Sequence, residues 1–355
     1  PLGPHKNPLL IDSPEAEAQR RKLSSLYLSS QSHLSHRSTL SLPSHPRRVL
    51  ISPNNKILAA TDNTGSLHLW DLSTSPPTAL PMPFSPQEAA SIALESDASS
   101  IAFSPDSNFL AFAGPLGRTL FVLDLSKNKI LYRLDTTSAF IREIAFSPNG
   151  LMLAAAGADL RIWDTSTGTL TFKNTFKPEY EHAASLLWSD ENTAIFTGHL
   201  NSQVFFHPLS QPGNSYLFAA DAKGFPVISI FSTYGETRFF IVSHNSDISS
   251  ISIDQATRQF ITDSDDNGKL TYEDQAHHAY LSKDERWIFI SGGLKTQIWS
   301  AFDREHIEII QFPARSIDSV LSSSQTLFAQ AGPGPHIFLW NWDDQPSYGF
   351  ISRSS

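Results

Sequence analysis

Short apolar runs separated by polar turns follow one another along most of the chain. In three places such a run stops at Ser-Pro followed by Asp or Asn, a combination that favours a type I turn. A second short apolar run then begins. The three turns are Ser52-Pro53-Asn54, Ser104-Pro105-Asp106 and Ser147-Pro148-Asn149, and the second runs cover 57–60, 109–113 and 152–156. This spacing predicts short antiparallel strands.

A third run in each unit ends in a large apolar residue followed by Asp. These endings are Trp70-Asp71, Leu123-Asp124 and Trp163-Asp164. A polar turn then leads to a fourth run, which is clearest at 129–134. Four short strands per unit are the content of one propeller blade.

This layout resembles the WD-repeat family, in which a Phe-Ser-Pro-Asp-Gly hairpin leads to a third strand ending in Trp-Asp. Later units depart from the pattern, with third runs ending at 208, 300 and 341. One further unit fits at 226–231, 238–242 and 248–253. Seven units of about 40–50 residues agree with the blade length of the family. The register between 226 and 275 stays open, because 262–274 imitates a second and third strand.

The resemblance implies an all-β protein, a seven-bladed β-propeller of four-stranded antiparallel blades, over residues 38–352. A propeller closes into a ring, because unpaired strand edges invite aggregation. Residues 38–42 are predicted to supply the outer strand of the last blade, in preference to 347–351.

Residues 1–37 are predicted to form an N-terminal extension. Ser13-Pro14 followed by acidic residues indicates the start of a helix over 14–30. Leu23, Leu26 and Tyr27 recur at helical spacing on it. This segment is interpreted as a helix packed on the rim or a disordered lead, or alternatively as a helix that docks a partner.

Composition and charge exclude several classes of function. The chain has no cysteine, which excludes disulfides, thiolate zinc sites and cysteine nucleophiles. Residues 1–50 hold seven basic and three acidic side chains, so their charge is +4; the remaining residues hold 19 basic and 32 acidic ones, which gives −13. An acidic body makes nucleic acid an unlikely main ligand. No apolar run reaches the roughly 20 residues of a membrane span, and we expect a cytoplasmic or nuclear protein.

One segment matches a calcium-binding loop. Asp263, Asp265, Asn267 and Asp274 stand at ligand positions, with Gly268 at the sharp turn. The last ligand is Asp in place of Glu, and the flanks are typical of strands, so an acidic hairpin turn is the alternative interpretation. No other metal site, nucleophile elbow or phosphate loop is found, and no cofactor is expected.

The resemblance therefore predicts a non-catalytic scaffold, a subunit of a larger intracellular complex that binds partner proteins through its loops and rim. By the geometry of the family, the loops entering the first strands present Arg48, Arg142 and Asp318, with both arginines as charged anchors. The competing hypothesis is a hydrolase or lyase with its site in the central channel and calcium at 263–274. A coat or pore component would differ only in its partners.

Overall fold

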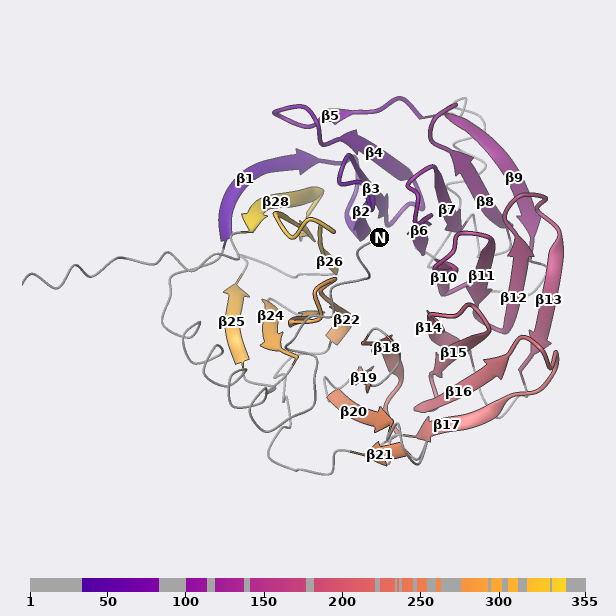
Figure 1. Cartoon of the computed structure of the whole chain (residues 1–355). Coiled ribbons are helices and arrows are strands. Elements are labelled where there is room, and N and C mark those ends of the chain that lie inside the picture. Colours follow the sequence, from indigo (N-terminus) through magenta and orange to yellow (C-terminus); the bar gives the residue numbers. More distant parts are fainter. Residues whose placement is uncertain are drawn as a thin grey trace, which may run out of the picture.

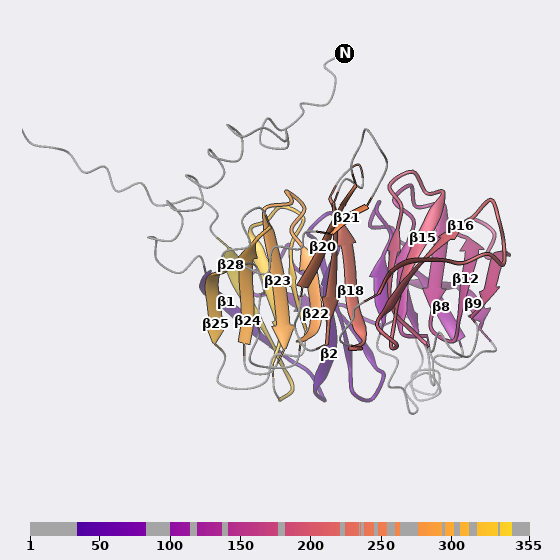
Figure 2. The same cartoon turned by 90° about the horizontal axis from the view of Figure 1, so that it is seen from below.

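The computed structural model describes residues 34–82, 100–113, 119–136, 141–176, 182–220, 224–233, 235, 238–244, 248–253, 260–262, 276–292, 295–301, 306–311, 318–332 and 334–342. These residues form seven four-stranded antiparallel sheets. Figure 1 shows the sheets arranged as blades around a central axis, and Figure 2 shows the strands running between the two faces of the ring. The predicted fold, an all-β seven-bladed propeller, is confirmed.

Blades are numbered in chain order, and each starts with its innermost strand. Blade 1 contains β2 (Pro46–Ile51), β3 (Ile57–Asp62), β4 (Leu67–Asp71) and β5 (Thr78–Ala79). Blade 2 contains β6 (Ile101–Phe103), β7 (Phe109–Ala113), β8 (Thr119–Asp124) and β9 (Lys129–Asp135). Blade 3 contains β10 (Glu143–Phe146), β11 (Met152–Ala156), β12 (Asp159–Asp164) and β13 (Leu170–Thr175).

The remaining blades repeat this order. Blade 4 contains β14 (Ala183–Trp188), β15 (Ala194–His199), β16 (Gln203–Pro208) and β17 (Tyr216–Ala220). Blade 5 contains β18 (Val227–Ser232), β19 (Arg238–Ser243), β20 (Ile248–Ile253) and β21 (Phe260–Thr262). Blade 6 contains β22 (Ala276–Leu281), β23 (Trp287–Gly292), β24 (Lys295–Ser300) and β25 (His306–Gln311). Blade 7 contains β26 (Asp318–Leu321), β27 (Leu327–Ala331), β28 (His336–Trp342) and β1 (Leu34–Ser41).

The Ser-Pro-Asp/Asn signature forms a double hydrogen-bonded turn between the first and second strands. The Ser52 hydroxyl accepts the backbone N–H of Ile57 at 2.9 Å, and Asn54 Oδ1 accepts that of Lys56 at 3.0 Å. The turns at Ser104 and Ser147 repeat both bonds. Side chains therefore satisfy backbone donors that the strands leave free, which explains why this short motif marks a blade.

The open register in blade 5 is resolved by strand pairing. β20 is the third strand, as placed from the sequence, and β21 pairs with it, with Ile251 opposite Thr262. Residues 260–262 are thus a fourth strand, and the rest of the segment that imitates a second and third strand, 263–274, lies outside the described residues.

The N-terminal strand closes the ring. β1 pairs with β28 over its whole length, from Leu34 opposite Trp342 to Ser41 opposite His336. This pairing confirms the predicted closure, although the strand begins before residue 38. The predicted helix with Leu23, Leu26 and Tyr27, and the competing segment 347–351, lie outside the described residues.

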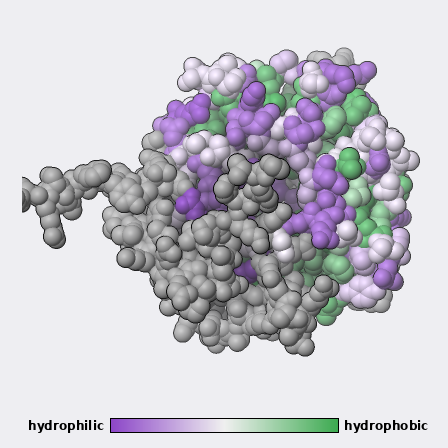
Figure 3. Space-filling model, in the orientation of Figure 1, coloured by the Kyte–Doolittle hydropathy of each residue, from purple (hydrophilic) through white to green (hydrophobic). Residues whose placement is uncertain are grey.

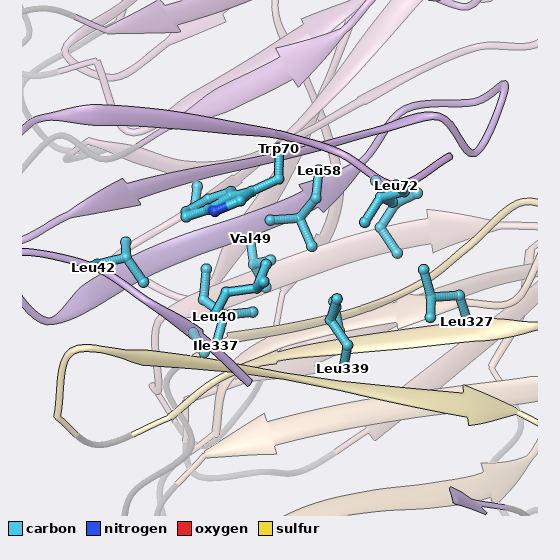
Figure 4. Close-up of a cluster of buried hydrophobic side chains, with 13 residues drawn as sticks. Leu40, Leu42, Val49, Leu58, Trp70, Leu72, Leu327, Ile337 and Leu339 are labelled. Carbon is cyan, nitrogen blue, oxygen red and sulfur yellow. The ribbon is translucent and has the colours of Figure 1, made fainter. Parts of the chain in front are cut away.

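Apolar packing joins the closing strand to blade 1. Leu40 of β1 and Leu339 of β28 lie against Val49, Leu58 and Trp70 of blade 1, as Figure 4 shows. All of these side chains are buried, and each contributes about 1.5–3 kcal/mol of hydrophobic stabilisation. The ring is therefore closed by strand pairing and by a shared core.

Candidate functional site

Every blade carries a polar residue at one equivalent position of its innermost strand or, in blade 2, directly before that strand. The position lies four residues before the Ser or Thr whose backbone N–H closes the turn to the second strand. We call these seven residues the inner ring, because the innermost strands surround the axis (Figure 1). The inner ring consists of Arg48, Ser100, Glu143, Ser185, Ser229, His278 and Asp318.

Asp318 connects three blades. Its side chain is only 1% exposed; Oδ2 accepts the backbone N–H of Val49 at 2.9 Å, and Oδ1 lies 2.8 Å from Nδ1 of His278. The Nε atom of Arg48 lies 3.9 Å from Oδ2. One carboxylate thus links blade 7 to blade 6 and to blade 1, at the junction where the chain closes on itself.

Arg48 also reaches past its neighbouring blade. Its Nη2 lies 3.0 and 3.2 Å from the two carboxylate oxygens of Glu143 in blade 3. The intervening blade 2 carries only Ser100 at the ring position, and the small side chain leaves space for this contact. We call Arg48, Glu143, His278 and Asp318 the channel group.

The charges of the channel group support one another. Burial alone would raise the pKa of Asp318, but His278, Arg48 and the N–H of Val49 outweigh it and hold that pKa below its ordinary value of 3.8. For Arg48, burial acts to lower the pKa, and the attraction of Glu143 and Asp318 raises it further than burial lowers it. Asp318 and Arg48 are therefore permanently charged at neutral pH.

The serine positions of the inner ring repeat part of this pattern. Ser229 Oγ accepts the backbone N–H of Ala279 in blade 6 at 3.0 Å, which is the bond that Asp318 makes to Val49. The hydroxyls of Ser100 and Ser185 are buried and have no hydrogen-bond partner within the described part of the chain.

A second buried polar group lies between blades 3 and 4. We call Asn174, Thr197, His199, His207 and Ser215 the seam group. Nδ1 of His207 is 3.2 Å from Nδ2 of Asn174, and its Nε2 is 2.7 Å from the Thr197 hydroxyl. That hydroxyl also lies 2.8 Å from Nε2 of His199. Ser215 Oγ accepts from Asn174 Nδ2 at 2.8 Å.

The hydrogen bonds of the seam group run in one direction from Asn174 to His199. The Asn174 amide nitrogen can only donate, so Nδ1 of His207 accepts, and Nε2–H donates to Thr197. The Thr197 hydroxyl then donates to His199. Burial lowers the pKa of His207 to about 3, and the nearby His199 acts in the same direction. Both rings are fully buried, so His207 is uncharged at neutral pH.

The structure places the predicted site residues unequally. Arg48 and Asp318, both predicted to face a partner, instead lie against each other inside the ring. Arg142 is exposed and lies one residue before the ring position, which Glu143 occupies. The calcium candidates Asp263, Asp265, Asn267 and Asp274 lie outside the described residues, so this loop stays a prediction. Within the described ranges, no group of three His, Asp or Glu side chains has a metal-binding arrangement.

Comparison with known proteins identifies the repeat. The family model for "WD domain, G-beta repeat" matches residues 128–164. Small ribosomal subunit protein RACK1y of Oryza sativa subsp. japonica is 33% identical over 92 residues, 24% of this chain and 27% of that protein. WD repeat-containing protein SL1-17 of Schistosoma mansoni is 27% identical over 130 residues, 36% of this chain and 39% of that protein. The chain thus matches less than half the length of these relatives.

The fold also matches a solved structure. The β-propeller domain of Myceliophteria thermophila Cps50 (Swd1) aligns with a TM-score of 0.70 and 13% identity, covering 87% of this chain and 99% of that domain. At this identity the likeness concerns the fold alone. Among the described residues, no helix is long and apolar enough to cross a bilayer.

Proposed function

Since this chain is a WD40-repeat β-propeller with degenerate repeats, we propose that it acts as a non-catalytic scaffold within an intracellular multiprotein complex, in the cytoplasm or nucleus. The family is typically non-catalytic, and the rice relative is named as a protein of the small ribosomal subunit. Both observations support a role as a subunit that holds other proteins. The acidic charge of the body favours protein partners over nucleic acid.

The main support for a protein partner comes from exposed apolar side chains. Large hydrophobic residues are exposed in one half of the ring only, as far as the chain is described: Leu131, Leu151, Leu170, Tyr216, Leu217 and Phe225. They belong to blades 2, 3 and 4 and to the link that follows, and Figure 3 shows apolar surface on this side of the ring. Apolar side chains gathered on one side of a rigid body favour protein partners there.

Native purification with cross-linking tests this proposal. The tagged full chain is purified from its own cells and cross-linked, and the cross-linked peptides are identified by mass spectrometry. We expect a stoichiometric partner protein whose cross-links fall on blades 2–4. Leu151→Glu combined with Leu217→Glu should reduce its recovery, because both side chains are among the most exposed apolar residues, at 64% and 57%.

A matched variant controls for charge. Thr78→Glu adds an acidic side chain to the exposed edge strand of blade 1, and it should leave partner recovery unchanged. A chain that purifies alone would refute the scaffold. Turnover of a small molecule that requires calcium and is lost in Asp265→Ala would instead support the competing enzyme.

A further inference from the structure

The Arg48 guanidinium has a hydrogen-bond donor that the described residues do not use. Both contacts to Glu143 are made by Nη2 alone. Nε lies 3.9 Å from Asp318 and has no hydrogen-bond partner in the part of the chain that the structure describes. An arginine that holds a carboxylate well uses two nitrogens against two oxygens. Glu143 therefore fills only part of the donor capacity of Arg48.

Ser100 adds another unused donor at the same level of the ring. It occupies the inner-ring position of blade 2, between the blades of Arg48 and Glu143. Its side chain is 2% exposed, and its hydroxyl has no hydrogen-bond partner among the described residues. Buried hydroxyls are normally satisfied. The Nε–H of Arg48 and the Ser100 hydroxyl both lack an acceptor among the described residues, and together they favour an oxyanion from outside the chain.

Glu143 is held much less firmly than Asp318. Its side chain is 20% exposed, against 1% for Asp318. Arg48 is its one polar side-chain contact in the described part of the chain, whereas Asp318 also binds His278 and the backbone of Val49. Glu143 can therefore swing into solvent while Asp318 keeps Arg48 in place.

We propose that Arg48 is a receptor for a carboxylate of a partner protein, and that Glu143 is an internal stand-in which the partner displaces. The incoming carboxylate takes two guanidinium nitrogens and the Ser100 hydroxyl. Asp318 already lies beside the guanidinium, so the incoming carboxylate would be the third there and would repel Glu143, which is the more exposed and less firmly held of the two. This inference rests on the proposed scaffold function and gives its partner an acidic anchoring residue.

Glutarate, which carries the carboxylate of a Glu side chain, serves as the probe. The full chain is titrated with glutarate, and binding is followed by the NMR signal of the Arg48 Nε–H group, assigned by its loss in Arg48→Lys. In Glu143→Gln the stand-in loses its charge, and we expect glutarate to bind at least tenfold more tightly than to the wild type. Uncharged glutaramide should not bind.

Further variants separate the site from general charge effects. In the Glu143→Gln background, Arg48→Lys should weaken glutarate binding at least tenfold, because lysine lacks the fork, and Ser100→Ala should weaken it severalfold. Arg142→Gln removes an exposed arginine next to the ring and should change binding less than twofold. Melting curves confirm that each variant is folded; Glu143→Asp, whose shorter side chain reaches Arg48 less well, replaces Glu143→Gln if that variant does not fold.

Four outcomes would overturn the inference. Equal glutarate binding by the wild type and the Glu143 variants would make Glu143 a simple brace. Equal binding of glutaramide would show that charge is not recognised. Binding of inorganic phosphate without glutarate would indicate a different anion. Recovery of the same partner by Arg48→Lys would remove this site and leave the scaffold intact, whereas the absence of any partner on the wild type would refute the scaffold itself.

Discussion

The channel group and the seam group brace neighbouring blades in opposite ways. The channel group uses charges: Asp318 and Arg48 are both ionised and are joined to Glu143 and His278. In the seam group the central residue, His207, is neutral, because it is buried among apolar and aromatic side chains such as Phe176. Both groups therefore join neighbouring blades, at different positions in the ring.

The difference follows from access to water and, for Asp318, which is only 1% exposed, from the partners that outweigh its burial: His278, Arg48 and the N–H of Val49. Arg48 and Glu143 keep 15% and 20% of their side chains exposed, so ionised groups retain some hydration and need fewer partners. His207 has none, and a charge there would face a large desolvation penalty. Only hydrogen bonds between neutral groups are stable in the seam. The two groups should thus respond differently to mutation and to pH.

The largest expected effect on the free energy of unfolding comes from removing the Asp318 side chain. Asp318→Ala leaves the guanidinium of Arg48 with one partner and the N–H of Val49 with none, at the junction of the first and last blades. Removing one partner of a buried ion pair costs about 3–5 kcal/mol. Urea unfolding measures this loss, and Asp318→Asn, which can still accept from Val49, should lose less. A loss below about 1 kcal/mol for Asp318→Ala would refute the central position of this carboxylate.

Acidification should weaken the seam group before the channel group. The unfolded His207 imidazole binds a proton near pH 6.5, whereas the folded one does so only near pH 3. Unfolding thus takes up a proton between these values, and stability falls as the pH falls from 6.5 to 3. From pH 6.5 to pH 5 the loss is about 2 kcal/mol.

The matched variant for this pH effect is His207→Gln. Its stability should vary less with pH over this range than that of the wild type, as measured by urea unfolding at each pH. The pKa of the Asp318 carboxyl is lowered from its ordinary value of 3.8. The contribution of this carboxylate to stability is therefore present above pH 3.8 and is lost only below it. Parallel pH curves for the wild type and His207→Gln would contradict the neutral assignment of His207.

Thr197→Val tests the middle of the seam chain. Valine has nearly the same shape, but it leaves Nε2–H of His207 buried without an acceptor, which costs about 1–2 kcal/mol. Thr197→Ser keeps the hydroxyl and should restore most of the stability. If valine and serine behave alike in urea unfolding, the hydroxyl does not connect the two histidines.

The blades were predictable from the sequence because their signals are local. Ser52, Asn54 and Ile57 lie within six residues of each other, and their hydrogen bonds close one turn. The same chemistry recurs at Ser104 and Ser147, so a repeat is visible even where Trp-Asp is lost. The placement of β20 and the closure by β1 followed from counting such units.

The two polar groups were not predictable in the same way, because their contacts are distant in sequence. Arg48 and Glu143 are 95 residues apart, and Val49 and Asp318 are 269 apart. The sequence predicts Arg48 and Asp318 as loop residues, but it does not indicate that they contact each other, or that Arg48 contacts Glu143. The loop before the first strand of blade 3 indicates Arg142, whereas the position four residues before the Ser or Thr of the turn is Glu143.

The smallest expected effect on stability concerns a third set of polar contacts between blades. These contacts lie at the turns between the first and second strands. There the residue in the left-handed conformation accepts a backbone N–H from the preceding blade: Asn192 Oδ1 binds the N–H of Asn149 at 3.0 Å, and Asn55 Oδ1 binds that of Ser324 at 3.3 Å. In blade 3 this position is Gly150, with φ of +72°, and it has no side chain for the bond.

Gly150→Asn should therefore supply the missing contact to blade 2. Asparagine tolerates this conformation, as Asn55 and Asn192 do with φ of 61° and 60°, and the nearest atom to a new Cβ is Pro105 Cδ at 3.6 Å. We expect a gain of about 0.5 kcal/mol in urea unfolding from the bond and the stiffer unfolded chain. Gly150→Ala places a side chain in the same left-handed backbone conformation but supplies no hydrogen-bond acceptor. This variant should therefore be about 1 kcal/mol less stable than Gly150→Asn. Equal stability of the two variants would show that the neutral bonds at these turns, unlike those of the seam, do not brace the blades.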